Sequence, residues 1–149
     1  MLLRTHLALV VLVILLFLKN VDNKLLFVFI TLVATMLPDI DTGFSTLGKH
    51  KSFKFLQFFV RHRGVIHSFT FCIIISLILA VFLPKISFAF FLGYSVHLFV
   101  DSLTKEGIMP FWPYKKKSSW HFKTGSLTET SLFFVLVLVD ILLIVFKFF

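Results

Sequence analysis

The residues of this sequence best suited to chemistry are histidines and carboxylates close to the ends of apolar stretches. His97 and Asp101 are four residues apart, a spacing that places both side chains on one face of a helix. Asp39 and Asp41 follow Pro38, which favours extended backbone, where residues two apart point the same way. Nitrogen and oxygen ligands without sulfur suit Zn²⁺, Mn²⁺ or Fe²⁺, so the pattern indicates a divalent-metal site.

Further histidines and one glutamate occupy equivalent places in the chain. His62 and His67 are five residues apart, a poor spacing for one helix face, but Gly64 between them permits a turn that brings them together. His6 and Glu129 stand at the starts of the first and last apolar stretches. More than four candidate ligands indicate one or two ions, with the remaining groups supporting the ligands or acting as a general base. Zinc is the expected ion, with manganese and iron as alternatives.

Each of these pairs also has a purely structural explanation. A histidine and an aspartate four residues apart, such as His97 and Asp101, often form a hydrogen bond at a helix end. Two aspartates after Pro38 are typical of a turn that ends a helix, and a serine after His67 is a common N-cap. Metal binding is favoured because the predicted helices bring all of these residues to one level of the fold.

Five apolar stretches must position these residues. Hydrophobic residues make up 58% of the 149 positions, the mean hydropathy is +1.00, and charged residues are only 15%, against about 25% in an ordinary soluble domain. This composition excludes a soluble globular domain and a disordered protein. It predicts an all-α integral membrane protein, one multi-pass domain over residues 1–149 with about five transmembrane helices. The predicted helices cover residues 7–18, 25–37, 69–83, 86–100 and 132–146.

The basic residues orient these five helices. With five spans, the N-terminus and the loops after the second and fourth helices share one side of the membrane. Eleven of the fifteen Lys and Arg residues fall on that side, so the N-terminus and both long loops are predicted to be cytoplasmic. The predicted ligands then lie at the cytoplasmic ends of helices, where charge next to the membrane is costly and usually functional. The eleven are Arg4, Lys49, Lys51, Lys54, Arg61, Arg63, Lys105, Lys115, Lys116, Lys117 and Lys123.

One carboxylate departs from this pattern. Asp140 lies eleven residues past Glu129, which is about 16 Å deeper along the last helix. It is either functional or a protonated contact between helices, and it is left outside the predicted site. His50 and His121 lie in basic loops and are expected to be solvated. The single cysteine, Cys72, excludes a thiolate metal cluster.

Arginines beside the predicted ligands indicate the class of substrate. Arg61 and Arg63 flank a predicted histidine ligand, and a guanidinium group binds phosphate through two parallel hydrogen bonds. A phosphoester, such as one in a lipid headgroup, is therefore the expected substrate, with Glu129 as general base. The lysine run 115–117 is expected to set topology and to contact anionic lipid, and residues 111–114 before it are typical of an aromatic anchor at the membrane interface.

At these residues the chain resembles the YdjM-like family of bacterial inner-membrane proteins. The resemblance implies a multi-pass inner-membrane protein with metal-dependent hydrolase activity and a link to LexA in the DNA-damage response. Thr42 stands where relatives often carry a histidine, so no ligand is expected there. The His97 and Asp101 element is also similar, by analogy only, to one in zinc-dependent phospholipase C enzymes. The matching stretches are 37–41, 62–64 with 67–68, 93–101, 104–113 and, more weakly, 124–129.

The sequence thus predicts a membrane-bound metal-dependent hydrolase. A divalent-metal carrier, a metal-stabilised scaffold and a basic protein that binds DNA or a repressor are the alternatives. A carrier needs polar residues along the membrane, and only Asp140 qualifies. Nucleic acid is not expected as a partner, because the positive charge follows the topology of the membrane helices. The first-choice ligands are Asp39, Asp41, His67, His97 and Asp101, with His6, His62 and Glu129 as further ligands or supporting groups.

Overall fold

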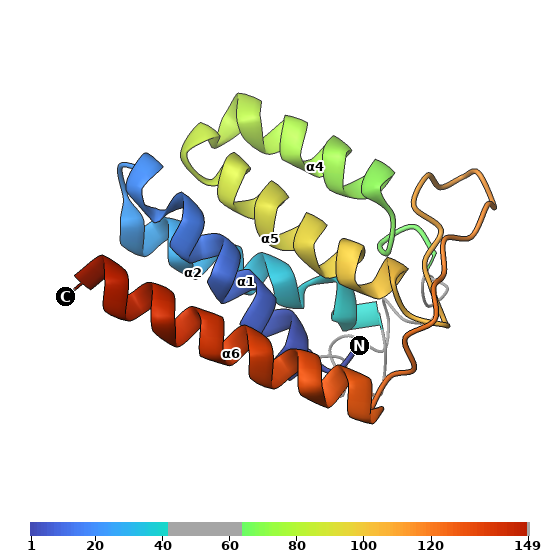
Figure 1. Ribbon diagram of the computed structural model, residues 1–149. Helices are drawn as coiled ribbons and strands as arrows, with labels where there is room; N and C mark the ends of the chain where they lie inside the picture. The colour runs from blue at the N-terminus through green and yellow to red at the C-terminus, as the bar shows by residue number, and fades with distance from the viewer. Residues whose placement is uncertain (42–63, 149) are drawn as a thin grey trace.

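The chain is a bundle of α-helices (Figure 1). The computed structural model describes residues 1–41 and 64–148, with the backbone alone for residues 40, 41 and 148. Within these ranges there is no strand, and each predicted apolar stretch corresponds to one α-helix, which confirms the all-α class. The elements are α1 (Leu3–Phe17), η1 (Leu18–Asn20), α2 (Lys24–Met36), η2 (Pro38–Asp41), α4 (Phe69–Phe82), α5 (Pro84–Ser102) and α6 (Leu127–Phe148), where η marks a 3-10 helix.

The short helix η2 corrects one prediction. The sequence favours extended backbone at Asp39 and Asp41, but both residues lie in this 3-10 helix. Pro38 fixes φ near the helical value, so it suits the first residue of a helical turn as well as an extended chain. A 3-10 helix has three residues per turn, so its backbone turns positions two apart about 120° away from each other. The prediction of extended backbone at these two positions is therefore wrong.

Helix α5 is the centre of the bundle. It packs against α1, α2 and α4, whereas α6 runs along α1 at the edge of the bundle (Figure 1). One apolar core cluster joins α1, α2 and α5 and includes Val10, Phe27 and Val96. A second joins α2, α4 and α5 and includes Cys72 and Leu98. Because α5 contributes to both clusters, residues along its length are held from several sides.

A close approach between α2 and α5 fixes how these two helices are aligned. A Cβ atom at Gly93 would lie 2.2 Å from the carbonyl oxygen of Thr31, so only glycine fits at this contact. The hydroxyl of Thr35 lies 2.8 Å from the carbonyl oxygen of Thr31 and 3.1 Å from that of Gly93. These contacts hold the second half of α2 directly against α5, one turn before His97.

The outward faces of the bundle are strongly apolar. Two segments, Leu3–Asn20 and Leu127–Lys147, are long and apolar enough to cross a membrane, and α2 and α4 are shorter apolar helices. Large hydrophobic side chains on α4 and α6, among them Leu77, Val81 and Phe134, are exposed. A soluble monomer rarely exposes so much contiguous apolar surface. Length and composition therefore support two membrane spans, and the five-span topology stays a prediction.

We expect Gly93→Ala to lower the free energy of unfolding by about 1–3 kcal/mol, the usual cost of forcing a carbon into a packed contact. The new methyl group would press on the backbone of Thr31, which cannot rotate away. Thermal unfolding of the purified protein in detergent measures the loss. Ser95→Ala on the same helix is the control, because its hydroxyl donates to the carbonyl oxygen of Leu92 one turn earlier within α5, and the substitution adds no atom. Equal unfolding midpoints for the two variants would contradict the close approach.

Candidate metal centre

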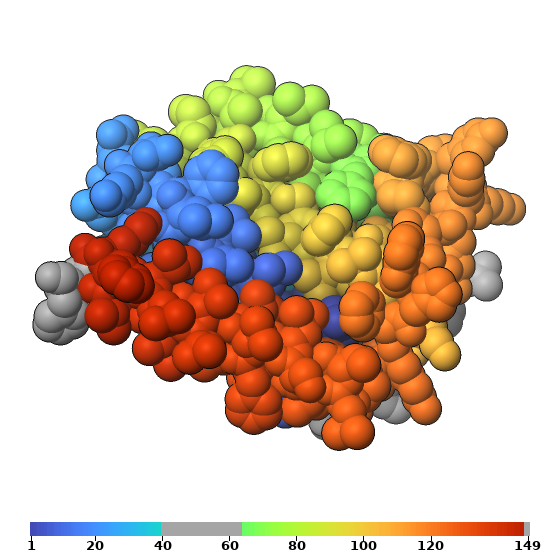
Figure 2. Space-filling view, in the orientation of Figure 1, coloured from blue at the N-terminus to red at the C-terminus, as the bar shows by residue number. Residues whose placement is uncertain are grey.

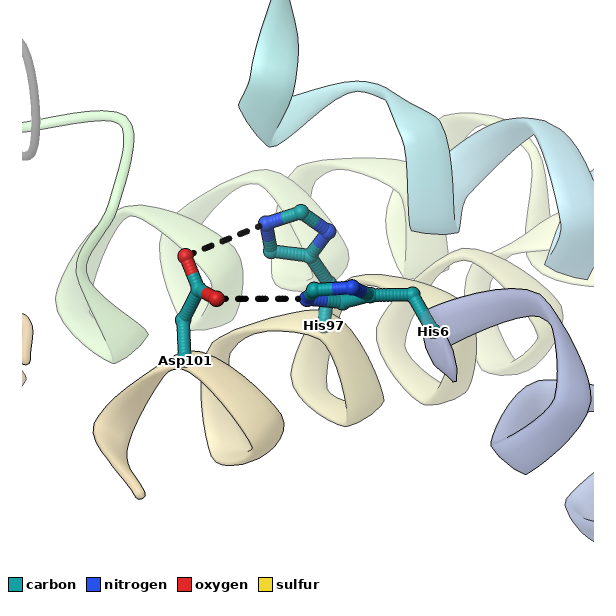
Figure 3. A group of neighbouring side chains, drawn as sticks. All are labelled: His6, His97 and Asp101. Atoms are coloured by element: carbon teal, nitrogen blue, oxygen red, sulfur yellow. Dashed lines mark ion pairs between the residues drawn. The ribbon is translucent and has the colours of Figure 1, made fainter. Parts of the chain in front are cut away.

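Three buried side chains from α1 and α5 meet at one end of the bundle (Figure 3). The two oxygens of the Asp101 carboxylate face two imidazoles: Oδ1 lies 3.3 Å from Nε2 of His6, and Oδ2 lies 3.8 Å from Nε2 of His97. The centroids of the His6 and His97 rings are 4.2 Å apart. No more than 4% of any of these side chains is exposed, so the group lies away from bulk solvent.

A second group shares one of these histidines. Oδ1 of Asp39 lies 3.8 Å from Nε2 of His97, and Nε2 of His67 lies 3.9 Å from Oδ2 of Asp101. In each group of three residues, the atoms that would bind an ion lie within 4.8 Å of one another. The structure therefore brings five of the predicted ligands together, and we call them the histidine–aspartate cluster: His6, Asp39, His67, His97 and Asp101.

Local structure explains how these side chains reach one place. His97 and Asp101 are one turn apart on α5, as the spacing predicts. The side chain of Ser68 accepts a hydrogen bond from the amide of Phe71 at 3.1 Å and caps α4. The N-cap interpretation is therefore right for this serine, and the cap leaves His67 just outside the helix, where it turns toward α5. Helix α1 starts earlier than predicted, at Leu3, so the cluster takes its first histidine from within the helix.

Backbone carbonyl groups fix the proton on two of the imidazoles. Nδ1 of His97 lies 2.8 Å from the carbonyl oxygen of Thr35, and Nδ1 of His6 lies 3.1 Å from that of Leu2. A carbonyl oxygen only accepts hydrogen bonds, so each Nδ1 carries a proton and donates it. In a neutral imidazole the Nε2 atom then presents a lone pair. Histidine ligands in protein metal sites are oriented in this same way.

These hydrogen bonds make the centre of the cluster rich in electron pairs. The Nε2 atoms of His6 and His97 face the carboxylate of Asp101, and Nε2 of His97 has no hydrogen-bond partner in the described part of the chain. Lone pairs that face a carboxylate repel it unless a cation lies between them. The α-amino group of Met1 supplies one positive charge, donating to Oδ1 of Asp101 at 2.6 Å. Oδ2 of the same carboxylate faces histidines instead.

The remaining carboxylate of the cluster is the most accessible member. A quarter of the Asp39 side chain is exposed, against none of the His97 side chain. Partial burial nevertheless raises the pKa of Asp39 above its ordinary value, because the charged form loses solvation. A cation bound beside Asp39 would favour its ionised form and so offset that loss.

Glu129 is buried but lies outside both groups of the cluster. Its Oε1 accepts hydrogen bonds from the amide of Leu2 at 2.6 Å and from the hydroxyl of Thr5 at 3.0 Å, and its Oε2 accepts one from the amide of Gly125 at 2.6 Å. Three donors therefore share the two oxygens of one carboxylate. These bonds tie the start of α6 to the start of α1, so Glu129 supports the helix that carries His6.

Several residues that the sequence analysis singled out lie outside the described part of the chain or outside the cluster. Arg61, His62 and Arg63 lie outside the described residues, and so do His50 and Thr42. Asp41 is described by its backbone alone, in η2. His121 is exposed, as predicted, and Asp140 is buried in α6 with no hydrogen-bond partner for its Oδ1 among the described residues.

The sequence analysis did not identify the groups that orient the histidines. The carbonyl groups of Leu2 and Thr35 belong to the backbone, and any residue could provide them. For the carbonyl of Thr35 the sequence does hold one indication. Gly93 lies one turn before His97 in an apolar helix, and a glycine inside a helix often marks the close approach of another backbone.

Apolar helices with a buried histidine–aspartate cluster at one end define an all-α membrane protein with a candidate metal centre. Residues 1–148 match the family described as YdjM inner membrane protein, and the chain belongs to this family. The match covers almost the whole chain and confirms the resemblance seen in the motifs. The family description also supports an inner-membrane location. No curated protein and no solved structure matched the chain.

We expect Glu129→Gln to lower the free energy of unfolding by about 1–3 kcal/mol, the cost of leaving a buried donor without an acceptor. The amide nitrogen of glutamine would face at least one of the three donors that the carboxylate now accepts. Denaturation in detergent measures the loss, with Asp22→Asn, an exposed carboxylate, as the control. No difference between the two variants would contradict the anchoring role of Glu129.

Proposed function

We propose that this inner-membrane protein is a metal-dependent hydrolase whose metal is held by the histidine–aspartate cluster. The observation that carries the proposal is the pair of fixed imidazoles, in which Nδ1 of His6 and of His97 is bonded to a backbone carbonyl while Nε2 faces the carboxylate of Asp101. A divalent cation between these atoms would turn repulsion into coordination.

The spacing of the donor atoms fits such an ion. Two ligands bound tetrahedrally to zinc at their usual bond lengths are about 3.3 Å apart. The ion pairs between histidine nitrogens and carboxylate oxygens run from 3.3 Å for His6 with Asp101 to 3.9 Å for His67 with Asp101, and the ligand atoms of each group of three residues lie within 4.8 Å of one another. Small side-chain rotations would therefore close the cluster around an ion. Three imidazoles with one or two carboxylates favour zinc, with manganese or iron as alternatives.

The number of ions is limited by the shared histidine. His97 belongs to both groups of three residues, and its Nδ1 is taken by Thr35. Its single remaining nitrogen binds one ion only. One ion ligated by several members of the cluster is therefore the simplest arrangement, and a second ion would depend on a carboxylate that binds both.

A bound divalent ion would supply a Lewis acid for hydrolysis. The expected substrate is a phosphoester, such as one in a lipid headgroup, at the cytoplasmic face of a five-span protein. Asp39, the most accessible member of the cluster, is where a substrate would first reach it. Arg61 and Arg63 would hold the phosphate, and Glu129 stays the proposed base, although its present hydrogen bonds would have to open for that role.

The alternative is a metal-stabilised scaffold without turnover. The deep burial of His6, His97 and Asp101 favours it, because a structural metal site is closed to solvent. The two functions share the metal and differ in chemistry. A test must therefore measure metal content first and turnover second.

Metal analysis of the detergent-purified protein tests the shared claim. We expect the wild type to hold about one equivalent of a divalent metal, and the His97→Ala, Asp101→Ala double variant to bind it at least tenfold more weakly, because both lost side chains belong to the cluster. His121→Ala is the matched control, since that histidine is exposed and outside the cluster. Equal, near-zero metal in all three proteins would overturn the proposal.

Turnover separates the enzyme from the scaffold. For the enzyme, we expect the metal-loaded wild type to hydrolyse a phospholipid or a soluble phosphoester, and chelation with EDTA to abolish the rate while added zinc restores it. For the scaffold, chelation would lower the unfolding temperature, because ligand binding stabilises the folded state, and a phosphoester screen would find no turnover. Metal binding with no turnover on any phosphoester would reject the hydrolase and keep the scaffold.

A further inference from the structure

The segment between α5 and α6 forms a folded arm that projects from one end of the bundle (Figures 1 and 2). We define the arm as residues 103–123. Ile108 and Ser118 exchange two backbone hydrogen bonds of 2.9 and 2.8 Å, as in a short antiparallel ladder. The amide of Trp120 donates to the carbonyl of Thr104 at 3.0 Å, which closes the base of the arm. The arm therefore has its own hydrogen-bonded frame.

The arm is fixed to the helices. Ile108 is buried in the core cluster shared by α2, α4 and α5. The carbonyl of Pro110 accepts a hydrogen bond from the amide of Phe69, at 2.8 Å, at the start of α4. Gly107 has a φ of 57°, and a Cβ there would lie 2.1 Å from the carbonyl oxygen of Ser118, so glycine is required where the two sides meet. The outer part of the arm is thus presented in a defined position.

The outer part carries aromatic and basic side chains together. Phe111, Trp112, Tyr114 and Trp120 are all exposed, the tyrosine by 74%. The three lysines of the run 115–117 are exposed beside them. The sequence has no acidic residue from 107 to 128, so no carboxylate of this segment neutralises the lysines.

The combination matches the chemistry of a membrane surface. Tryptophan and tyrosine concentrate at the headgroup layer, where an apolar ring with a polar tip is favoured. Clustered lysines are attracted to anionic phospholipids. We propose that this arm is a binding surface for anionic phospholipid headgroups, with the lysine run on the phosphates and the aromatic rings among the headgroups. The inference requires the membrane location but not metal binding.

The arm is also hydrogen-bonded to segments that carry members of the histidine–aspartate cluster. At its base, the hydroxyl of Thr104 donates to the carbonyl of Asp101 at 2.8 Å. Farther along, Pro110 bonds to Phe69, two residues after His67. A headgroup bound by the arm would therefore lie on a segment that is hydrogen-bonded next to two members of the cluster, His67 and Asp101.

Tryptophan fluorescence tests the proposal directly, because both tryptophans of the chain, Trp112 and Trp120, lie on the arm. The full chain is placed in nanodiscs of phosphatidylcholine alone or with added phosphatidylglycerol, with brominated acyl chains as quenchers. We expect the anionic lipid to shift the emission to shorter wavelength and to increase quenching. Salt near 1 M should reverse the change, because it shortens the Debye length to about 3 Å.

A matched pair of triple variants locates the charge that matters. Replacing Lys115, Lys116 and Lys117 with glutamine should weaken the preference for anionic lipid by about fivefold per lysine, on the order of a hundredfold in all. The control replaces Lys19, Lys24 and Lys85 with glutamine, which removes the same charge from the other ends of the helices. The control should keep the wild-type response.

Three outcomes would overturn the proposal. One is equal emission and quenching in the two lipid compositions. Another is an unchanged response in the variant that lacks the lysine run. The third is a response to a soluble DNA oligonucleotide or an acidic peptide without any response to phosphatidylglycerol. Because none of these measurements involves metal or turnover, failure here would be distinct from failure of the proposed hydrolase.

Discussion

The hydrogen bond between Nδ1 of His97 and the carbonyl oxygen of Thr35 is the interaction on which the candidate site depends. It exists only because Gly93 lets the backbone of α2 lie against α5. Once it forms, the proton of the imidazole is committed to Nδ1, and Nε2 presents its lone pair to the carboxylates of Asp39 and Asp101. The uncharged packing contact at Gly93 thereby determines which nitrogen of His97 carries the proton and which faces the carboxylates.

The site combines two kinds of support. Apolar packing holds α5 between its neighbours, and hydrogen bonds to backbone groups hold the polar side chains within that packing. Buried polar groups are costly when left without partners, so each bond restricts the side chain it serves. Among the described residues, Nε2 of His6 and Nε2 of His97 are buried atoms of the cluster without a hydrogen-bond partner. Buried atoms without partners that face the same carboxylate are where a ligand is most needed.

Much of this arrangement could be predicted from the sequence, for identifiable reasons. Apolar runs of helical length predict the five α-helices, and the four-residue spacing of His97 and Asp101 predicts that both lie on one face of α5. The conformation of η2 was not predictable, because proline permits both an extended chain and a helical turn. Nor was the anchoring of Glu129, since its partners Leu2 and Gly125 contribute backbone amides. Because every residue has a backbone amide, the sequence does not indicate which amides will bind a side chain.

The bond between the amide of Leu2 and Glu129 joins residues 127 positions apart. A ribosome adding about 5–20 residues per second needs many seconds to make the second partner after the first. Until then the segment that carries His6 lacks the anchor that α6 provides, and Asp101 is itself synthesised 95 residues after that histidine. The cluster is therefore completed late in biosynthesis. The helix that carries His6 is therefore anchored only after the last helix has been made.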